Sequence, residues 1–419
     1  MRVLVIGSGG REHTICWKLK QSPKVSEVYC APGNPGIASI AENIAIKVDD
    51  IEELVQFAQS KKIDLTVVGP EYPLTLGIVD AFHKSGLRVF GPTQAAARLE
   101  GSKYFAKEVM ERAGIPTAGY KVFSDQQAAV AWVDEVGAPI VIKDDGLAAG
   151  KGVFVCQSVA EAKSALQKLF SGPEPSQVIV EDCLEGKEAS FIAVTDGETV
   201  VRLAASHDYK RIRDNDAGPN TGGMGTVSPT PHLTPEQEQW VMDSVMLPTV
   251  REMKRSGMPY CGFLYAGMLM DKTKGLQVLE FNARLGDPET QVILRRMKGD
   301  FFELLYSLSA SGEQNTVAPV AWDSRAAVCV VVAAEGYPEN VKKGDAIGGI
   351  KDAEQISDCI VFHAGTSVDS SGRLVTAGGR VLNVTALGRD VEEAREKAYQ
   401  AVEQIQFRGK QHRSDIGQA

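Results

Sequence analysis

Cysteine pairs and histidine clusters are missing from this sequence of 419 residues. The seven cysteines are widely scattered without a Cys-x-x-Cys pair, which indicates reduced thiols and argues against a disulfide framework or a cysteine zinc site. None of the six histidines has another at metal-ligand spacing, and no Ser/His or Cys/His arrangement stands out. Nucleophilic hydrolysis by a triad therefore has no support.

Long apolar runs are also missing. The longest strictly apolar run, 326–334, is less than half of the roughly 18 residues that a membrane span needs, and the N-terminal apolar stretch meets Gly7 too soon for a signal peptide. Positive charge is scarce, since 45 Lys plus Arg face 54 Asp plus Glu, for a net charge of −9. We expect a cytoplasmic protein with no nucleic-acid or membrane partner, in which an anionic substrate would need a local basic cluster.

What is present is the composition of a globular enzyme, with 43% hydrophobic and 24% charged residues. At roughly 100 to 200 residues per domain, two or three domains are expected. In the first hundred residues, short apolar runs that end in Gly or Pro alternate with amphipathic stretches, a pattern that predicts a parallel sheet with helices on its faces. These runs are 2–6, 28–31, 65–68 and 88–90.

The turn Gly7-Ser8-Gly9-Gly10 leads into a helix whose first N–H groups could hold a phosphate. A nicotinamide dinucleotide fold is disfavoured, because Glu12 replaces the third glycine of the fingerprint and the second strand lacks the acid for a ribose. Further on, Ser102 is a predicted helix N-cap. Lys103 in the first turn opposes the helix dipole, which suits a lysine that faces a phosphate, with a solvated lysine as the alternative.

The middle of the chain predicts a compact α+β segment at about 120–195, an irregular polar and glycine-rich loop region over 204–231, and a helix over 237–255. Two strands over 262–271 and 276–282 follow. The last hundred residues predict four strands and a closing amphipathic helix that Asp390 and Glu393 cap.

A loop of glycine and alanine joins Lys143, at the end of one predicted strand, to the next strand. Such a loop can offer N–H donors to phosphates while lysines neutralise their charge. It is not a Walker A loop, because Gly146 and Gly150 are one residue too close and Gly152 stands where Ser or Thr would bind magnesium. A plain hairpin is the alternative.

Alternation on the strand 278–282 places Glu280 and Asn282 on one face and Leu279 with Phe281 on the other. A carboxylate and an amide oxygen side by side suit magnesium, with a solvated strand face as the alternative. Separately, 207–213 is the only dense basic cluster, and the glycine-rich stretch 220–225 follows it. Together they would suit a phosphorylated or carboxylate substrate. The alternative interpretation of the basic cluster is a solvated run of charged residues.

Five motifs, at 7–13, 146–153, 218–225, 280–291 and 376–388, closely resemble the phosphoribosylamine–glycine ligase (glycinamide ribonucleotide synthetase) family of the ATP-grasp superfamily. The resemblance spans the whole chain. The lysine and glycine loop alone would indicate only an ATP-grasp enzyme, whereas 218–225 and 280–291 are specific to this ligase. A different ATP-grasp carboxylate–amine ligase or carboxylase, or a non-catalytic ATP-binding regulator, is the alternative.

The resemblance implies an α/β fold with an N-terminal parallel-sheet, Rossmann-like domain (1–102) that binds substrate. A two-part α+β ATP-grasp domain (103–324) with a mobile lid (about 120–195) and a small C-terminal α+β domain (325–419) would follow. The implied reaction of purine biosynthesis joins glycine to 5-phosphoribosylamine with ATP, through glycyl phosphate, and gives glycinamide ribonucleotide, ADP and phosphate. A monomer or a weak dimer is expected.

The resemblance also implies residue roles, with Lys143 and Arg284 catalytic and Glu280 and Asn282 as ligands of magnesium or manganese. ATP would contact Lys103, Lys143, Gly146, Gly150, Lys151, Gly152, Glu181, Leu184 and Glu188. Phosphoribosylamine and glycine would contact Gly9, Gly10, Glu12, Asp208, Lys210, Asn220, Thr221, Gly222, Gly223, Arg284 and Asp287.

Three departures from the family pattern stand out. Asp144 replaces a small residue, and alternation predicts that it points away from the face of Lys143. His207 and Tyr209 flank Asp208 where glutamine and histidine are expected. The strand before Glu280 offers Gly267, Met268 and Leu269 where many ATP-grasp enzymes place an acid, which leaves two protein ligands for a metal.

Overall fold

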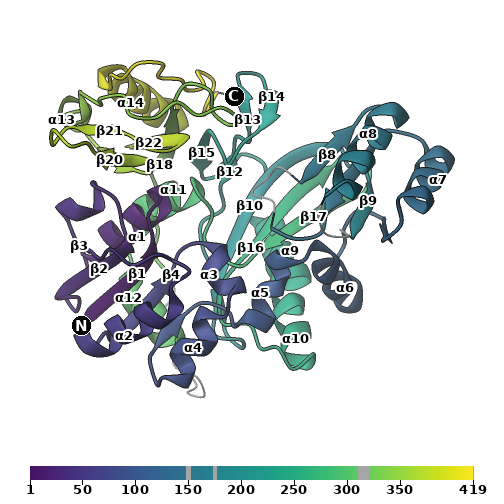
Figure 1. Cartoon of the computed structure of the whole chain (residues 1–419), viewed down its shortest axis with the longest axis horizontal. Coiled ribbons are helices and arrows are strands. Elements are labelled where there is room, and N and C mark those ends of the chain that lie inside the picture. Colours follow the sequence, from purple (N-terminus) through teal and green to yellow (C-terminus); the bar gives the residue numbers. More distant parts are fainter. Residues whose placement is uncertain (148–151, 173–176, 310–319, 419) are drawn as a thin grey trace.

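The computed structural model describes residues 1–147, 152–172, 177–309 and 320–418. In Figure 1 the purple N-terminal region lies beside the yellow C-terminal region, and a teal arm projects away from both. Within the described ranges, no helix is long and apolar enough to cross a membrane.

The N-terminal region is built on a parallel sheet with the strand order β3-β2-β1-β4-β5. Its elements are β1 (Arg2–Gly7), α1 (Gly10–Leu19), β2 (Glu27–Pro32), a 3-10 turn (Ile37–Ser39), β3 (Glu42–Asn43), α2 (Ile51–Lys61), β4 (Leu65–Val68), α3 (Glu71–Thr75), α4 (Ile78–Lys84), β5 (Val89–Phe90) and α5 (Gln94–Gly101). The predicted parallel sheet is confirmed. The order reverses between β1 and β4, so the crevice at their carboxyl ends is where such folds bind ligands.

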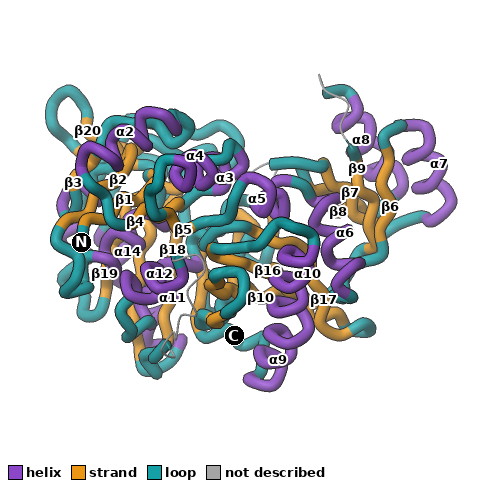
Figure 2. The backbone as a smooth tube through the Cα atoms, turned by 90° about the horizontal axis from the view of Figure 1, so that it is seen from below, coloured by secondary structure: helices purple, strands orange, loops and turns teal. Residues whose placement is uncertain are grey.

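The projecting arm is an antiparallel sheet, β6-β9-β7-β8, that two helices cover, and we call it the lid. After α6 (Lys103–Ala113) it contains β6 (Tyr120–Phe123), α7 (Gln126–Val136), β7 (Ile140–Asp144), β8 (Val153–Cys156), α8 (Val159–Phe170) and β9 (Val178–Asp182). These strands and helices agree with the compact α+β segment that the sequence predicts at about 120–195. Figures 1 and 2 both show the lid standing away from the main body, and its buried apolar residues form a separate core.

A second antiparallel sheet, β11-β10-β16-β17, forms the floor below the lid. It consists of β10 (Gly186–Thr195), β11 (Val200–Arg202), β16 (Gly262–Asp271) and β17 (Gly275–Asn282). The predicted helix over 237–255 is present as α9 (Pro235–Val241), a π-helical turn (Met242–Met246) and α10 (Leu247–Arg255). Apolar residues of this sheet and of α6 share one core with the N-terminal region, which fixes the floor to that region.

The C-terminal region follows α11 (Glu289–Arg296) and α12 (Phe301–Leu308) and centres on the sheet β12-β15-β18-β22-β19. Its later elements are β18 (Ala326–Ala333), α13 (Ile350–Ala353), β19 (Cys359–His363), β20 (Thr366–Val368), β21 (Leu374–Thr376), β22 (Arg380–Gly388) and α14 (Val391–Gln404). The Asp390 side chain accepts a hydrogen bond from Glu393 N at 2.9 Å, so the Asp390 half of the predicted cap is confirmed. The Glu393 side chain accepts from Arg389 N at 2.7 Å and not from the N-cap nitrogen, so the second half of the cap differs from the prediction.

The irregular loop predicted over 204–231 is wrong in part. This stretch contains β12 (His207–Asp208), β13 (Arg211–Arg213), β14 (Ala217–Asn220) and β15 (Gly225–Ser228). β15 pairs with β18 and β12 pairs with β15, so both belong to the C-terminal sheet. Strands that form by pairing with a distant segment leave little local signal in a glycine-rich sequence.

Candidate active site

The start of α6 and the end of β7 meet at the base of the lid. Ser102 caps α6, as predicted, by accepting a hydrogen bond from Phe105 N at 3.0 Å. Lys103 Nζ donates to the carbonyl oxygens of Asp144 (3.0 Å) and Gly146 (2.7 Å), so this lysine holds the beginning of the glycine loop. Burial lowers the pKa of Lys103.

The rest of the loop is described only in part. The Gly152 carbonyl accepts a hydrogen bond from Asp144 N at 2.8 Å, which closes the base of the loop. Gly150 and Lys151 lie outside the described residues. Leu184, one of the predicted ATP contacts, is half-buried in the link between β9 and β10.

Lys143 is buried between the lid and the floor. Its Nζ lies 2.8 Å from Glu181 Oε2 and donates to the Leu279 carbonyl at 3.2 Å. The other carboxylate oxygen of Glu181 lies 3.2 Å from Lys107 Nζ. Lys107 was not among the predicted site residues, although its position one helical turn after Lys103 was the available signal.

Glu280 lies on β17 at the centre of a positive environment. Its carboxylate makes no hydrogen bond or ion pair with another described residue. Burial alone would raise its pKa, but Lys210, Lys143 and Lys103 outweigh burial, and the pKa is below its usual value. Glu280 is therefore ionised and free to bind a ligand.

The predicted alternation around Glu280 is interrupted. Glu280 pairs with Gly267 and Val278 pairs with Met268, so a bulge leaves Leu279 without a partner in the register. Phe281 and Val278 enter the core, and the prediction that Leu279 shares the face of Phe281 is not met. The bulge turns the Leu279 carbonyl to Lys143.

Arg284 is held by two carboxylates that sequence reasoning missed. Its guanidinium lies 3.1 Å from Glu71 Oε2 and 2.9 Å from Glu100 Oε1, and it donates to Asn282 Oδ1 at 3.2 Å. Burial raises the pKa of Glu100 to about 7 even with Arg284 beside it. Arg284 therefore links β17 to the crevice of the N-terminal sheet, and it orients Asn282 next to Glu280.

A further carboxylate, the half-buried Asp208, lies near the floor. Its Oδ1 has no hydrogen-bond partner among the described residues, and burial raises its pKa. Lys210 Nζ lies 2.7 Å from Glu188 Oε2, so Glu188, one of the predicted ATP contacts, already has a cationic partner. His207 stacks edge-on to Tyr209 with ring centroids 4.6 Å apart, so the two departures from the family pattern contact each other.

The predicted substrate loop after Asn220 is held from the C-terminal region. Thr221 donates through its hydroxyl to the Lys210 carbonyl at 2.8 Å, and Gly222 N donates to Tyr337 Oη at 2.9 Å. Arg380, at the start of β22, donates to the carbonyl oxygens of Gly222 and Asp287. Neither Arg380 nor Tyr337 was predicted, because only the fold brings these segments together.

Two glycines permit this packing. Gly223 has φ +108°, and a Cβ there would lie 2.7 Å from Asp208 Oδ1. A Cβ on Gly10 would lie 2.0 Å from the Asn383 amide nitrogen. The loop and the N-terminal turn therefore approach their neighbours more closely than any other residue would allow.

The turn at Gly9 and Gly10 follows β1, but its N–H groups, predicted to be able to hold a phosphate, are not all free. Gly9 N donates to Glu12 Oε2 at 2.6 Å, and Glu12 Oε1 lies 2.6 Å from Arg11 Nε. Glu12 is buried beneath the turn. In this structure it supports the turn and does not face the crevice as a free carboxylate.

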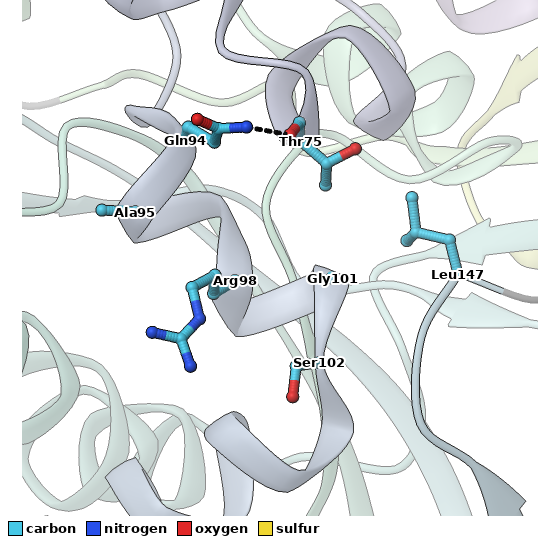
Figure 3. Close-up of a pocket in the computed structure, with 7 residues that line it drawn as sticks. All are labelled: Thr75, Gln94, Ala95, Arg98, Gly101, Ser102 and Leu147. Carbon is cyan, nitrogen blue, oxygen red and sulfur yellow. Dashed lines mark hydrogen bonds between the residues drawn. The ribbon is translucent and has the colours of Figure 1, made fainter. Parts of the chain in front are cut away.

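A hollow of about 690 Å³ opens beside the loop, between α3, α5 and Leu147. Figure 3 shows the Gln94 amide donating to the Thr75 carbonyl on one side, with Leu147 facing across. None of the predicted site residues lines it. Its polar side chains at Gln94 and Arg98 are exposed, and we assign it no ligand.

Asp144→Ala is expected to leave ATP affinity unchanged within about twofold. Asp144 shares its strand face with Ile142, which lies in the lid core, and its Oδ1 has no hydrogen-bond partner among the described residues. Lys103 contacts the Asp144 carbonyl, which alanine keeps. Titration of the variant with ATP measures this, and a clear tightening would show that the carboxylate opposes the triphosphate.

Comparisons with known proteins agree along the chain. Residues 1–100, 101–290 and 327–419 match the N domain, the ATP-grasp (A) domain and the C domain of phosphoribosylglycinamide synthetase. The chain is 51% identical over 423 residues to the phosphoribosylamine–glycine ligase of Vibrio vulnificus (strain CMCP6), a match that covers 100% of this chain and 98% of that protein.

Solved structures show the same relationship. The crystal structure of phosphoribosylamine–glycine ligase from Thermotoga maritima has a TM-score of 0.86 and 35% identity, with 99% of this chain and 100% of that chain covered. The biotin carboxylase domain of the Hydrogenobacter thermophilus 2-oxoglutarate carboxylase, solved with MgADP, has a TM-score of 0.72 and 18% identity, with 98% and 91% covered. The second likeness shows the fold alone.

Proposed function

The chain belongs to the phosphoribosylglycinamide synthetase family, and from that membership we propose how its residues act. It is an ATP-dependent ligase of purine biosynthesis that joins glycine to 5-phosphoribosylamine and releases ADP and phosphate. In the proposed course, a glycine carboxylate oxygen bonds to the γ-phosphorus and ADP leaves. The phosphoribosylamine nitrogen then bonds to the glycyl carbonyl carbon, loses a proton, and phosphate leaves.

The observation that carries this proposal is the set of cations around Glu280. Lys103, Lys143, Lys210 and Arg284 all act on this one carboxylate, and they come from the lid base, the floor and the substrate segment. Such a group stabilises the charge on a phosphoryl group in transfer by position and electrostatics, so a protein nucleophile is unnecessary. Lys143 and Lys103 would contact the ATP phosphates.

The residues present fit a divalent metal that arrives with ATP. Glu280 has an ionised carboxylate without a hydrogen-bond partner among the described residues, and Asn282 Oδ1 is fixed beside it by Arg284. Two protein oxygens suit magnesium or manganese, which fill their other positions with water and phosphate oxygens. A metal held there would neutralise charge on the transferred phosphoryl group. The neighbouring lysines disfavour a bare cation, which supports its entry as the nucleotide complex.

The substrate amine is proposed to face Asp208. A buried carboxylate oxygen without a partner among the described residues suits an amine donor. Arg380, which contacts the 220–223 loop, is proposed to hold the ribose phosphate, because a guanidinium binds phosphate well. Gly9, Gly10 and Asp287 would complete this side of the site.

ADP release is expected to require glycine and phosphoribosylamine together. A coupled ADP assay with each substrate omitted in turn measures this, and simple primary amines serve as the control for a broader carboxylate–amine ligase. ADP release that such amines support equally well would contradict the proposed specificity. The domain bounds 1–102, 103–324 and 325–419, the monomeric or weakly dimeric state and the cytoplasmic location remain predictions.

A further inference from the structure

Lys107 is a buried charge with no assigned role in the reaction. Its side chain is 2% exposed, so it cannot reach ATP. The Nζ donates to Thr117 Oγ1 at 2.8 Å and to the Ala118 carbonyl at 3.3 Å, and it lies 3.2 Å from Glu181 Oε1. The position of the ammonium is therefore fixed by α6 and by the link into the lid.

Glu181 lies between two lysines, with one carboxylate oxygen for each. Oε2 is 2.8 Å from Lys143, and Oε1 has only the ion pair with Lys107, since no described residue gives it a hydrogen bond. All three side chains are buried. One negative charge thus faces two positive charges, and the cluster keeps a net positive charge on the side that Lys143 turns to the floor.

We propose that Lys107 is a positioning residue that offsets the charge of Glu181, so that Lys143 stays available to the phosphates of ATP. Without Lys107, Glu181 would be neutralised by Lys143 alone, and the nucleotide would have to compete with that buried ion pair. This inference rests on the proposed function, in which Lys143 contacts ATP.

The other charged groups around Lys107 agree with this role. Glu181 and Asp182 face it from β9, Lys143 from β7, and the Tyr120 ring lies 5.3 Å from Nζ. Burial, and to a smaller extent Lys143, lower the pKa of Lys107 to about 8. The pair of like charges is therefore close enough to interact.

The test measures the Kd of ATP and of adenosine by calorimetry on the full-length enzyme without the other substrates. Lys107→Met is expected to weaken ATP about tenfold and to leave adenosine within about twofold, because only the phosphates sense the charge. Lys163→Met, which removes an exposed lid lysine from its pair with Asp134, is the control and should change neither. Equal weakening of ATP and adenosine would overturn the proposal, since it would show damage to the whole pocket.

A second comparison uses Glu181→Gln as the background. If Lys107 acts through Glu181, Lys107→Met added to Glu181→Gln should change the Kd of ATP by less than about threefold. A tenfold change in both backgrounds would overturn the proposal. Glu181→Gln and the double variant both lack the buried carboxylate. Comparing them therefore tests whether Lys107 acts through Glu181 even if Lys107→Met alone does not fold. Lys143→Ala distinguishes a failure of the role proposed for Lys107 from a failure of the proposed function. Normal ATP binding by that variant would contradict the proposed function, in which Lys143 contacts ATP.

Discussion

Glu280→Gln is expected to lower kcat by about 100-fold, the size of effect seen when one preorganised electrostatic group is removed. The amide keeps the shape of the side chain but loses the charge that Lys103, Lys143 and Lys210 surround. The carboxylate on which Lys103, Lys143, Lys210 and Arg284 all act would lose its charge, and the divalent metal would lose its charged ligand. Steady-state turnover at saturating substrates, repeated over a magnesium titration, measures both effects.

A carboxylate-to-amide change away from the site serves as the control, and substitutions of Asn282 test the second proposed metal ligand. Glu198→Gln changes an exposed carboxylate that pairs only with Lys254 and should leave kcat within twofold. Asn282→Asp keeps an oxygen ligand and should retain more activity than Asn282→Ala, although its charge also strengthens the contact with Arg284. Near-normal turnover of Glu280→Gln and Asn282→Ala at limiting magnesium would refute the metal assignment.

Lys143→Ala should lower kcat/KM for ATP by about 100-fold and leave the KM for glycine within about threefold. The ammonium is fixed between Glu181 and the Leu279 carbonyl, so its charge is placed before ATP arrives. Alanine would also leave Glu181 with Lys107 as its only cation, a neutral pair that attracts no phosphate. Separate measurement of the two Michaelis constants tests this.

Lys121→Ala provides the matched control. Lys121 is exposed on β6 of the same lid, where its Nζ lies 4.0 Å from the centroid of the Trp132 ring, and its loss should leave both constants within twofold. A dominant effect of Lys143→Ala on glycine would show that Lys143 belongs to the other substrate. Thermal unfolding of both variants separates loss of binding from loss of fold.

The sequence predicted the elements and residues whose signals are local. Ser102 and Lys103 stand at a helix start, and Lys143 and Glu280 lie near the ends of two strands, so each could be read from a few neighbours. The lid could also be predicted from the sequence, because its short strands and helices have clear local hydrophobic patterns.

The partners of those residues could not be read in this way. Glu71 and Glu100, from α3 and α5, meet Arg284 only in the folded chain, and Arg380 reaches Gly222 only through the C-terminal sheet. Ion pairs between distant segments leave no spacing pattern. The bulge at Leu279 was hidden as well, since a strand sequence does not state how its partner is aligned.

The separate core of the lid has a consequence for how the chain loses its fold. Residues such as Val133, Ile142 and Leu166 belong to a core that only lid residues form, whereas the floor and the N-terminal region share a core. Leu166→Ala would leave a cavity in the lid core, at a cost of about 2–5 kcal/mol. This cost would lower the free energy of unfolding of the lid and not that of the main body. The lid can therefore open as its own cooperative unit while the main body stays folded. A single free energy of unfolding does not describe such a molecule, and denaturation followed by lid and body probes should not coincide.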